Sequence, residues 1–439
     1  MSAILNPMNQ YSTTKPRLSR IAKLFVGILL IVVLEGAFRK WISSELTNPL
    51  VLLRDAMALY GVLFAVSTGR LKLRQGGGQI LLFWTAIFIS WGLLQLILNS
   101  GSFFIFIIGA RFWLLYLWFA YAVAVSITAH DFNFIGKTIV LLMLAMTPLA
   151  IMQHLLPPGA FLNKQVDGDE STVFRVSGDI VRTTGTFSFT LGFTTLLALA
   201  TPFVLASLAS VYKLWNRSLI PKIGILALSI STVVSGSRGA IIFFGLLFFV
   251  FILYSLVYSK KSQKLTVVLT LVAAIGLLGL LPFFFMRSID ANRERFESAA
   301  QSEDISDRII SIFIGEPGSY ENLPLIGHGV GVGTNFAGVV ATGQRTFLLA
   351  ETEAARTILE GGLLGIAFIC LKLLVIAIGL HKSWSISKSS GNILPFLLWI
   401  TASLALLSWS IIGQLTVNAL GYLLFGLAIA SLRLVVRRS

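Results

Sequence analysis

Charged residues are scarce in this chain of 439 residues, since Asp, Glu, Lys and Arg together make up only 12% of it. Soluble proteins carry about 25% charged residues, and a surface with half that share would aggregate in water unless lipid covered it. The composition therefore excludes a water-soluble fold. Cysteine is scarce as well. Cys370 is the only one, which excludes a disulfide framework and a cysteine metal site.

The chain is instead rich in long apolar runs. Of its residues, 56% are hydrophobic, and the mean hydropathy is +0.86. A helix of about 20 apolar residues crosses the roughly 30 Å hydrocarbon core of a bilayer. Twelve such runs occur, at residues 21–38, 49–69, 79–98, 111–129, 136–155, 187–212, 219–235, 239–258, 264–286, 356–380, 392–412 and 414–432. The sequence predicts an all-α polytopic membrane protein of about 12 transmembrane helices, with a large periplasmic loop between helices 9 and 10.

The polar stretches divide the chain into segments. We expect a cytoplasmic N-terminal tail at 1–20, transmembrane helices 1–9 at 21–286 with a periplasmic loop at 156–186, the large periplasmic loop at 287–355, transmembrane helices 10–12 at 356–432, and a cytoplasmic tail at 433–439. Within the large loop, Ile305, Ile309, Ile312 and Phe313 recur at helical spacing. This pattern predicts an amphipathic helix that lies on the bundle or on the bilayer surface.

The net charge of +15 is divided unevenly between the two faces of the predicted bundle. With the N-terminus inside, the inner face carries 20 Lys and Arg and a single acid, Asp131, while the outer face carries 14 Lys and Arg and 18 acids. Cytoplasmic loops of membrane proteins are enriched in Lys and Arg. Both termini are therefore predicted to be cytoplasmic, and the basic composition indicates membrane orientation and not a nucleic-acid partner.

The two faces also differ in the kind of basic residue that they carry. Twelve of the 14 outer basic residues are arginines, whereas 12 of the 20 inner ones are lysines. A guanidinium offers a rigid fork of donors that grips phosphate or carboxylate at two points. One interpretation is that the outer arginines pair with the outer acids. Arg182 and Arg238 have few acids nearby in sequence, so they are stronger candidates for binding an anion.

Three polar motifs accompany the outer face. The SGSRGA stretch, 235–240, places Arg238 among small residues, which suits either an anion site or a tight turn between helices. The GHGVGVG stretch, 327–333, resembles a phosphate-binding glycine run but is predicted to be a flexible turn, because it lacks the strand-to-helix setting of a nucleotide site. The third motif is AETEAARTILEGGLLG, 350–365.

The acids of this third motif have different expected roles. Glu353, Arg356 and Glu360 fall on one face of a helix. Glu353 is predicted to cap the helix N-terminus, and Glu360 to make a buried polar contact. Glu351 lies at the mouth of the helix, where it is the best-placed carboxylate to act as a base toward a hydroxyl. No cluster of His, Cys or carboxylates indicates a metal site.

Taken in order, these motifs resemble one family. The chain has RTTGTF (182–187) before a span, then SGSRGA, then a long outer loop with RFESAAQSEDISDRIISIF (295–313), then PLIGHGVG (324–331), and finally an E-x-G-x-x-G element formed by Glu360, Gly362 and Gly365. This order is similar to that of the O-antigen ligase and Wzy-type O-antigen polymerase superfamily. The resemblance covers residues 180–380 by motif and the whole chain by its predicted topology.

The resemblance implies a membrane-embedded glycosyltransferase of the bacterial inner membrane. The implied donor is an undecaprenyl-diphosphate-linked oligosaccharide used on the periplasmic face, with no metal and no cofactor; other polysaccharide-assembly membrane proteins are implied partners. Carried over by motif, Arg182, Arg238, Arg308 and Arg356 bind the diphosphate, Glu351 is the catalytic base, and Glu353 and Glu360 support the site.

The chain departs from the family pattern at one place, and two alternatives remain open. Ligases of this family usually carry a His-Asn pair where Glu351 and Thr352 stand here, which favours a polymerase over an O-antigen or exopolysaccharide ligase. The alternative of another class is a secondary transporter of an anionic solute, which would also suit twelve spans with arginines near membrane depth. The apolar midspan positions, apart from Lys372, favour the transferase.

Overall fold

The computed structural model describes most of the chain between residues 17 and 436. The described residues are 17–99, 101–166, 173–176, 178–209, 212, 214–215, 219–258, 276, 286, 289–294, 296–297, 305–320, 323–343 and 348–436. Over these ranges the chain is helical and no strand is found; a single antiparallel bridge joins Arg175 and Val181. The expected all-α membrane-protein architecture is confirmed for this part.

The described part of the chain forms the following main helices. They are α1 (Arg20–Trp41), α2 (Thr47–Ser67), α3 (Gly76–Leu98), α4 (Phe103–Ala110), the π-helical segment η2 (Arg111–Leu115), α5 (Tyr116–Ser126), α6 (Ala129–Leu155), α7 (Thr190–Leu208), α8 (Leu219–Val234), α9 (Arg238–Tyr258), α11 (Ile305–Ile314), α12 (Asn335–Thr342), α13 (Glu353–Gly361), α14 (Leu363–Ser390), α15 (Leu394–Ser408) and α16 (Leu415–Val436).

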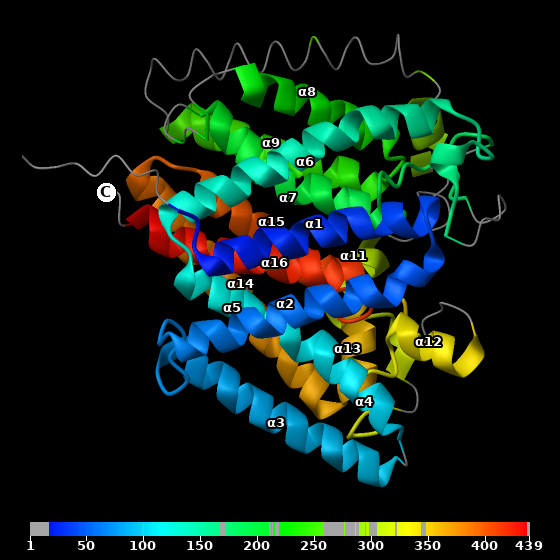
Figure 1. The fold of residues 1–439 in the computed structure, drawn as a ribbon, viewed down its shortest axis with the longest axis vertical. Helices are drawn as coiled ribbons and strands as arrows, with labels where there is room; N and C mark the ends of the chain where they lie inside the picture. Colours follow the sequence, from blue (N-terminus) through cyan, green and yellow to red (C-terminus); the bar gives the residue numbers. More distant parts are fainter. Residues whose placement is uncertain are drawn as a thin grey trace, which may run out of the picture.

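The long helices lie side by side in one slab, from α8 at the top of Figure 1 to α3 at the bottom. The bundle has two ends. At the basic end, on the left of Figure 1, α1 begins and α14 ends, and the α2–α3 turn carries Arg70, Lys72 and Arg74. At the loop end, on the right, the short helices α11, α12 and α13 gather.

Nine of the helices in the described ranges are long and apolar enough to cross a membrane, counting η2 with α4 and α5 as one, and α8 and α15 are shorter apolar helices. Each of these eleven overlaps a predicted span. The twelfth, predicted at 264–286, lies outside the described residues apart from residues 276 and 286, as do most of residues 287–304, so the count of 12 stays a prediction. The predicted amphipathic helix appears in part as α11.

The structure divides the predicted span 356–380 in two. Gly362 has a φ of +58° and breaks the helix there, so α13 ends at Gly361 and α14 runs on from Leu363 to Ser390. A side chain at Gly362 would collide with the backbone of the 325–327 turn. Arg356 and Glu360 therefore lie on a short helix of their own at the loop end, because close packing of this turn requires glycine.

Burial is greatest in the middle of the slab. The membrane-spanning windows of α7 and α16 are 78% buried, whereas those of α2 and α3 are only 22% buried. Helices that are apolar all round and lie at the edge expose their side chains to lipid. The centre of the bundle is thus built on α7 and α16, and α2 and α3 form an edge.

Candidate functional site

At the loop end, two of the predicted anion motifs pack against each other. The side chain of Arg182 lies beside Gly236, where a Cβ would come within 3.2 Å of Arg182 Cγ. Gly236 has a φ of +61° and stands two residues before Arg238. Thr183 Oγ1 donates a hydrogen bond of 3.3 Å to the carbonyl of Val234. RTTGTF and SGSRGA, about fifty residues apart in sequence, therefore form one unit.

Buried polar side chains hold the RTTGTF segment in place. Gln153 Oε1 accepts hydrogen bonds from the backbone N–H groups of Thr184, at 3.2 Å, and Gly185, at 2.8 Å. Lys40 Nζ donates to Thr184 Oγ1 and to the carbonyl of Gly185, both at 2.9 Å. Because buried polar groups are costly unless paired, these contacts fix the backbone that leads to Arg182.

His154 is a residue of this unit that the sequence analysis did not single out. It lies in the last turn of α6, and its imidazole lies near the backbone of both Val181 and Val234. It thus lies beside both motif segments. A lone histidine at the end of an apolar run carries no sequence signal for such a role, because both partners are distant in the chain.

Arg238 begins α9 and, like Arg182, is half-buried. The predicted large loop, 287–355, contacts the chain just before the SGSRGA turn, since Asn292 Nδ2 donates a hydrogen bond of 3.1 Å to the carbonyl of Val233. A half-buried guanidinium at the surface of a membrane bundle is exposed to a lower dielectric than bulk water, which strengthens its interaction with an anion.

The second half of the site is α13 and the residues just before it. Glu351 is exposed, whereas Arg356 is fully buried. Arg356 Nη2 donates to the backbone carbonyls of Ala350, at 3.0 Å, and Glu351, at 2.8 Å, and Arg356 Nη1 lies 3.3 Å from Glu353 Oε2. The Arg356 side chain thus points into the protein, where its guanidinium holds the backbone at Ala350 and Glu351 in place.

The turn between α15 and α16 connects this half to α9. Glu353 Oε1 accepts a hydrogen bond of 2.9 Å from the N–H of Ile412. Trp409, in the same turn, stacks on Phe243 of α9 with 5.9 Å between the ring centroids. Glu353 therefore ties α13 to its neighbours, a role beyond the predicted capping of its own helix.

Glu360 makes the buried contact that its position predicts. The carboxylate is fully buried and accepts hydrogen bonds from Trp113 Nε1, at 2.9 Å, and from the N–H of Gly333, at 2.8 Å. The GHGVGVG stretch packs against the same helix, since the N–H of His328 donates to the carbonyl of Leu359 at 2.8 Å. In the structure this glycine run packs on α13.

Glu360 gives a pH dependence that can be measured. Burial raises the pKa of Glu360 to about 7, opposed by the Trp113 N–H, by the backbone N–H groups of Gly331 and Gly333 and by Arg356. The folded state then binds its proton more tightly than the unfolded chain, so the free energy of unfolding falls as the pH rises from about 4.5 to 7. We expect the melting temperature to fall more steeply over this interval in the wild type than in Glu360→Gln. Parallel curves would contradict this.

Arg356 gives a second prediction, on stability. Its removal leaves the Glu353 carboxylate, 4% exposed, without its ion-pair partner, and breaking a buried pair costs about 3–5 kcal/mol. We expect Arg356→Met to unfold at a clearly lower temperature in detergent, and Arg356→Met with Glu353→Gln to recover part of the loss. A singly substituted protein of normal stability would mean that Arg356 has no structural role and would favour its predicted role as a diphosphate ligand.

Arg308 lies on α11, which packs against α13 and α15. The fold therefore brings four of the predicted residues, Glu351, Glu353, Arg356 and Glu360, together on or beside α13, with Arg308 on a neighbouring helix. Arg182 and Arg238 lie instead on the unit formed by the RTTGTF and SGSRGA segments.

A cluster of ion pairs is formed by Glu35 and Arg54, which are buried, and by Asp55 and Arg111, which are partly buried. Arg54 Nη1 is 2.8 Å from Glu35 Oε2, and Arg111 grips Asp55 with Nε at 2.6 Å and Nη2 at 2.9 Å. Tyr116 OH donates to Asp55 Oδ1 at 3.1 Å. Arg54 and Arg111, two of the predicted outer arginines, thus pair with acids, as one interpretation of the sequence predicts. Their ion pairs join α1, α2 and η2.

Within the described residues, no group of three His, Cys, Asp or Glu side chains is placed to hold a metal ion. Neither a protein-family model nor a curated protein matches the chain, so the resemblance to the O-antigen ligase and polymerase superfamily rests on the motifs and their order.

Proposed function

We propose that the protein is a membrane glycosyltransferase of the O-antigen polymerase or ligase type, which uses an undecaprenyl-diphosphate-linked oligosaccharide at its loop end. The observation that carries the proposal is the pair of half-buried arginines, Arg182 and Arg238, on two interlocked motif segments. Arginine is the side chain best suited to grip the oxygens of a diphosphate. The exposed carboxylate of Glu351, just before α13, supplies the group that would accept a proton.

The reaction exchanges one bond to the anomeric carbon of the donor sugar for another. The acceptor hydroxyl oxygen attacks this carbon, and the bond from the carbon to the diphosphate oxygen breaks. The hydroxyl proton passes to the Glu351 carboxylate, and the electron pair of the broken bond stays on the departing undecaprenyl diphosphate. Arg182 and Arg238 would stabilise the charge that develops on the leaving oxygen.

In this proposal Arg356 acts as a positioning residue. Its hydrogen bonds to the carbonyls of Ala350 and Glu351 hold the backbone from which the Glu351 side chain extends. Its burial makes direct contact with a diphosphate less favourable than for Arg182 or Arg238. Arg308 remains a proposed diphosphate contact from the neighbouring helix.

The surface polysaccharide of a strain that lacks the gene tests the proposal and separates its two forms. Loss of a polymerase leaves acceptors capped with single repeat units, whereas loss of a ligase leaves lipid-linked polymer that is not transferred. An unchanged polysaccharide profile would contradict both forms. The transporter alternative instead expects uptake of a labelled anion into proteoliposomes that contain the purified protein.

A further inference from the structure

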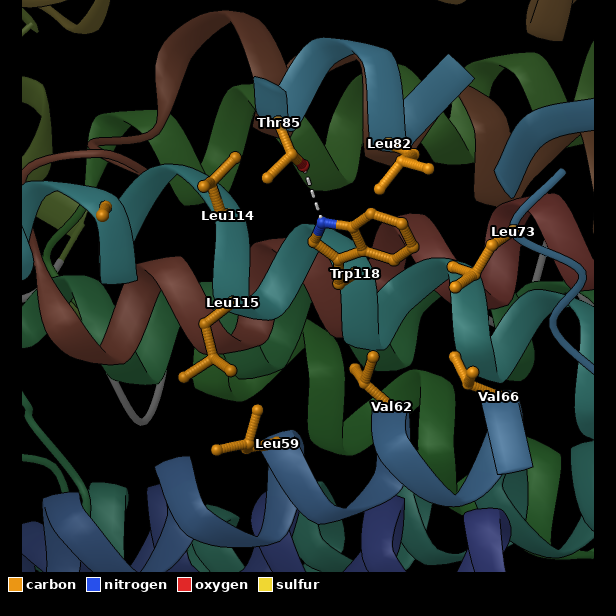
Figure 2. Close-up of a pocket in the computed structure, with 10 residues that line it drawn as sticks. Leu59, Val62, Val66, Leu73, Leu82, Thr85, Leu114, Leu115 and Trp118 are labelled. Carbon is orange, nitrogen blue, oxygen red and sulfur yellow. Dashed lines mark hydrogen bonds between the residues drawn. The ribbon is translucent and has the colours of Figure 1, made fainter. Parts of the chain in front are cut away.

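An apolar groove opens between α2, α3 and the α4–α5 segment, with a volume of about 350 Å³. Its ten lining residues come from these helices and from the α2–α3 turn: Leu59, Val62, Val66, Leu73, Leu82, Thr85, Ala110, Leu114, Leu115 and Trp118 (Figure 2). The volume is that of a small-molecule site. Both α2 and α3 pack against α5; α2 also packs against α1, and α3 against α4. The groove is the space between α2 and α3 over their common neighbour, α5.

The lining offers no hydrogen bond to a ligand. Its polar groups are the Thr85 hydroxyl and the Trp118 N–H, and they bond to each other at 2.9 Å (Figure 2). Thr85 Oγ1 also donates to the carbonyl of Leu81. Two leucines at the rim, Leu59 and Leu82, are 51% and 45% exposed. A groove of this kind between membrane-spanning helices suits a hydrocarbon chain.

The groove lies mainly in the half of the bundle toward the basic end. On α2 its lining residues, Leu59, Val62 and Val66, all belong to that half, and on the α4–α5 segment the lining begins at Ala110, about a third of the way from the loop end. Half of a hydrocarbon core of roughly 30 Å is the depth of one leaflet. The groove therefore faces the leaflet at the basic end, which the positive-inside rule predicts to be the cytoplasmic one.

Positive charge surrounds the point where the groove reaches this surface. Leu73 lines the groove, and its direct neighbours in sequence, Lys72 and Arg74, are both exposed, as is Arg70. None of these three side chains pairs with an acid of the described chain. Arg20 adds a fourth positive charge, with its guanidinium 5.1 Å from the centre of the Phe64 ring at the same end of α2.

We propose that this groove binds an anionic phospholipid of the cytoplasmic leaflet. One acyl chain lies between α2 and α3, and the headgroup phosphate meets Lys72 and Arg74. Charge complementarity identifies the occupant, because each Lys or Arg near a membrane surface favours anionic lipid. The site lies at the opposite end of the bundle from Arg182 and Arg238, so it goes beyond the proposed transferase and does not depend on it.

The test is native mass spectrometry of the full-length protein after equilibration with equal amounts of phosphatidylglycerol and phosphatidylethanolamine in mild detergent. We expect the wild type to retain phosphatidylglycerol preferentially. Removal of each charge is expected to weaken this preference about fivefold, so Lys72→Gln with Arg74→Gln should lower it about 30-fold. The control is Lys382→Gln with Lys388→Gln, which removes two exposed charges at the same end, on α14, and is expected to bind as the wild type does.

A second pair of variants tests the groove itself. Leu82→Trp places an indole in the groove from its rim and is expected to abolish lipid retention. Leu93→Trp makes the same change on α3 at a residue that is also 45% exposed but does not line the groove, and it should have no effect. Equal retention of the two lipids by the wild type, full retention by Leu82→Trp, or displacement of phosphatidylglycerol by undecaprenyl phosphate would each overturn the proposal.

Discussion

Replacement of Arg182 or Arg238 by alanine is expected to slow glycan transfer by about 10²- to 10³-fold, which is the usual cost of removing one group that stabilises charge in a transition state. The reason is that a guanidinium supplies both the charge and the paired donors that a leaving diphosphate needs. Arg182→Lys and Arg238→Lys should recover only part of the rate, because an ammonium group lacks the planar fork. The measurement is the turnover of purified protein with lipid-linked donor.

A matched control lies in the same loop. Arg175 is 43% exposed and is 3.8 Å from the carboxylate of Asp179, so Arg175→Ala removes an arginine seven residues from Arg182 without changing the proposed site. It should transfer at the wild-type rate. If both arginines act on one diphosphate, Arg182→Ala with Arg238→Ala should lose less than the product of the single losses. Wild-type turnover in either single alanine variant would exclude that residue from the mechanism.

Glu351→Gln is expected to lower turnover by about 10²- to 10⁴-fold, the range that a general base contributes, and to leave donor binding intact. Glutamine has the same shape as glutamate but cannot accept a proton at neutral pH. Because Arg356 bonds the backbone carbonyl of Glu351 and not its side chain, the substitution should leave the surrounding structure unchanged. Turnover and donor affinity measured on the same preparation separate the two effects.

The control for this change is Glu297→Gln, which alters a 59% exposed carboxylate whose partner is Arg293. It should leave both quantities at their wild-type values. A Glu351→Gln protein that turns over normally would show that another group accepts the proton. A variant that binds donor poorly would instead move Glu351 from proton transfer to substrate binding.

The helices could be predicted from the sequence because each is a long apolar run whose hydrogen bonds join residues close together in the chain. Eleven of the predicted spans overlap helices of the structure. In ten of them only the ends shift, as in the fourth, which begins at Phe103 and not at 111, whereas the span 356–380 is divided between α13 and α14. The break at Gly362 was harder to foresee, because a glycine pair within an apolar run is compatible with a continuous helix. The φ of +58° becomes necessary only through the 325–327 turn that packs on it.

The partners of the candidate site residues could not be predicted in the same way. Trp113 and Glu360 are 247 residues apart, and Ile412 and Glu353 are 59 apart. The motif AETEAARTILEGGLLG indicates that its acids have roles in the site or in buried contacts, but the sequence does not indicate which residues they contact. The shared face of Glu353, Arg356 and Glu360 was a local inference from helical spacing, whereas the tie from Glu353 to Ile412 depends on how distant helices pack.

The π-helical segment Arg111–Leu115 sets the rotational phase of the helix that follows it. Residues five apart point about 140° away from each other around an α-helix, yet Arg111 and Tyr116 both reach the carboxylate of Asp55. The wider π turn brings them onto one side, while Trp113 between them faces Glu360. One extra residue in this helix thus lets a single turn contact two carboxylates on different neighbouring helices, the partly buried Asp55 and the fully buried Glu360. A regular α-helix in its place would lose one of the two contacts.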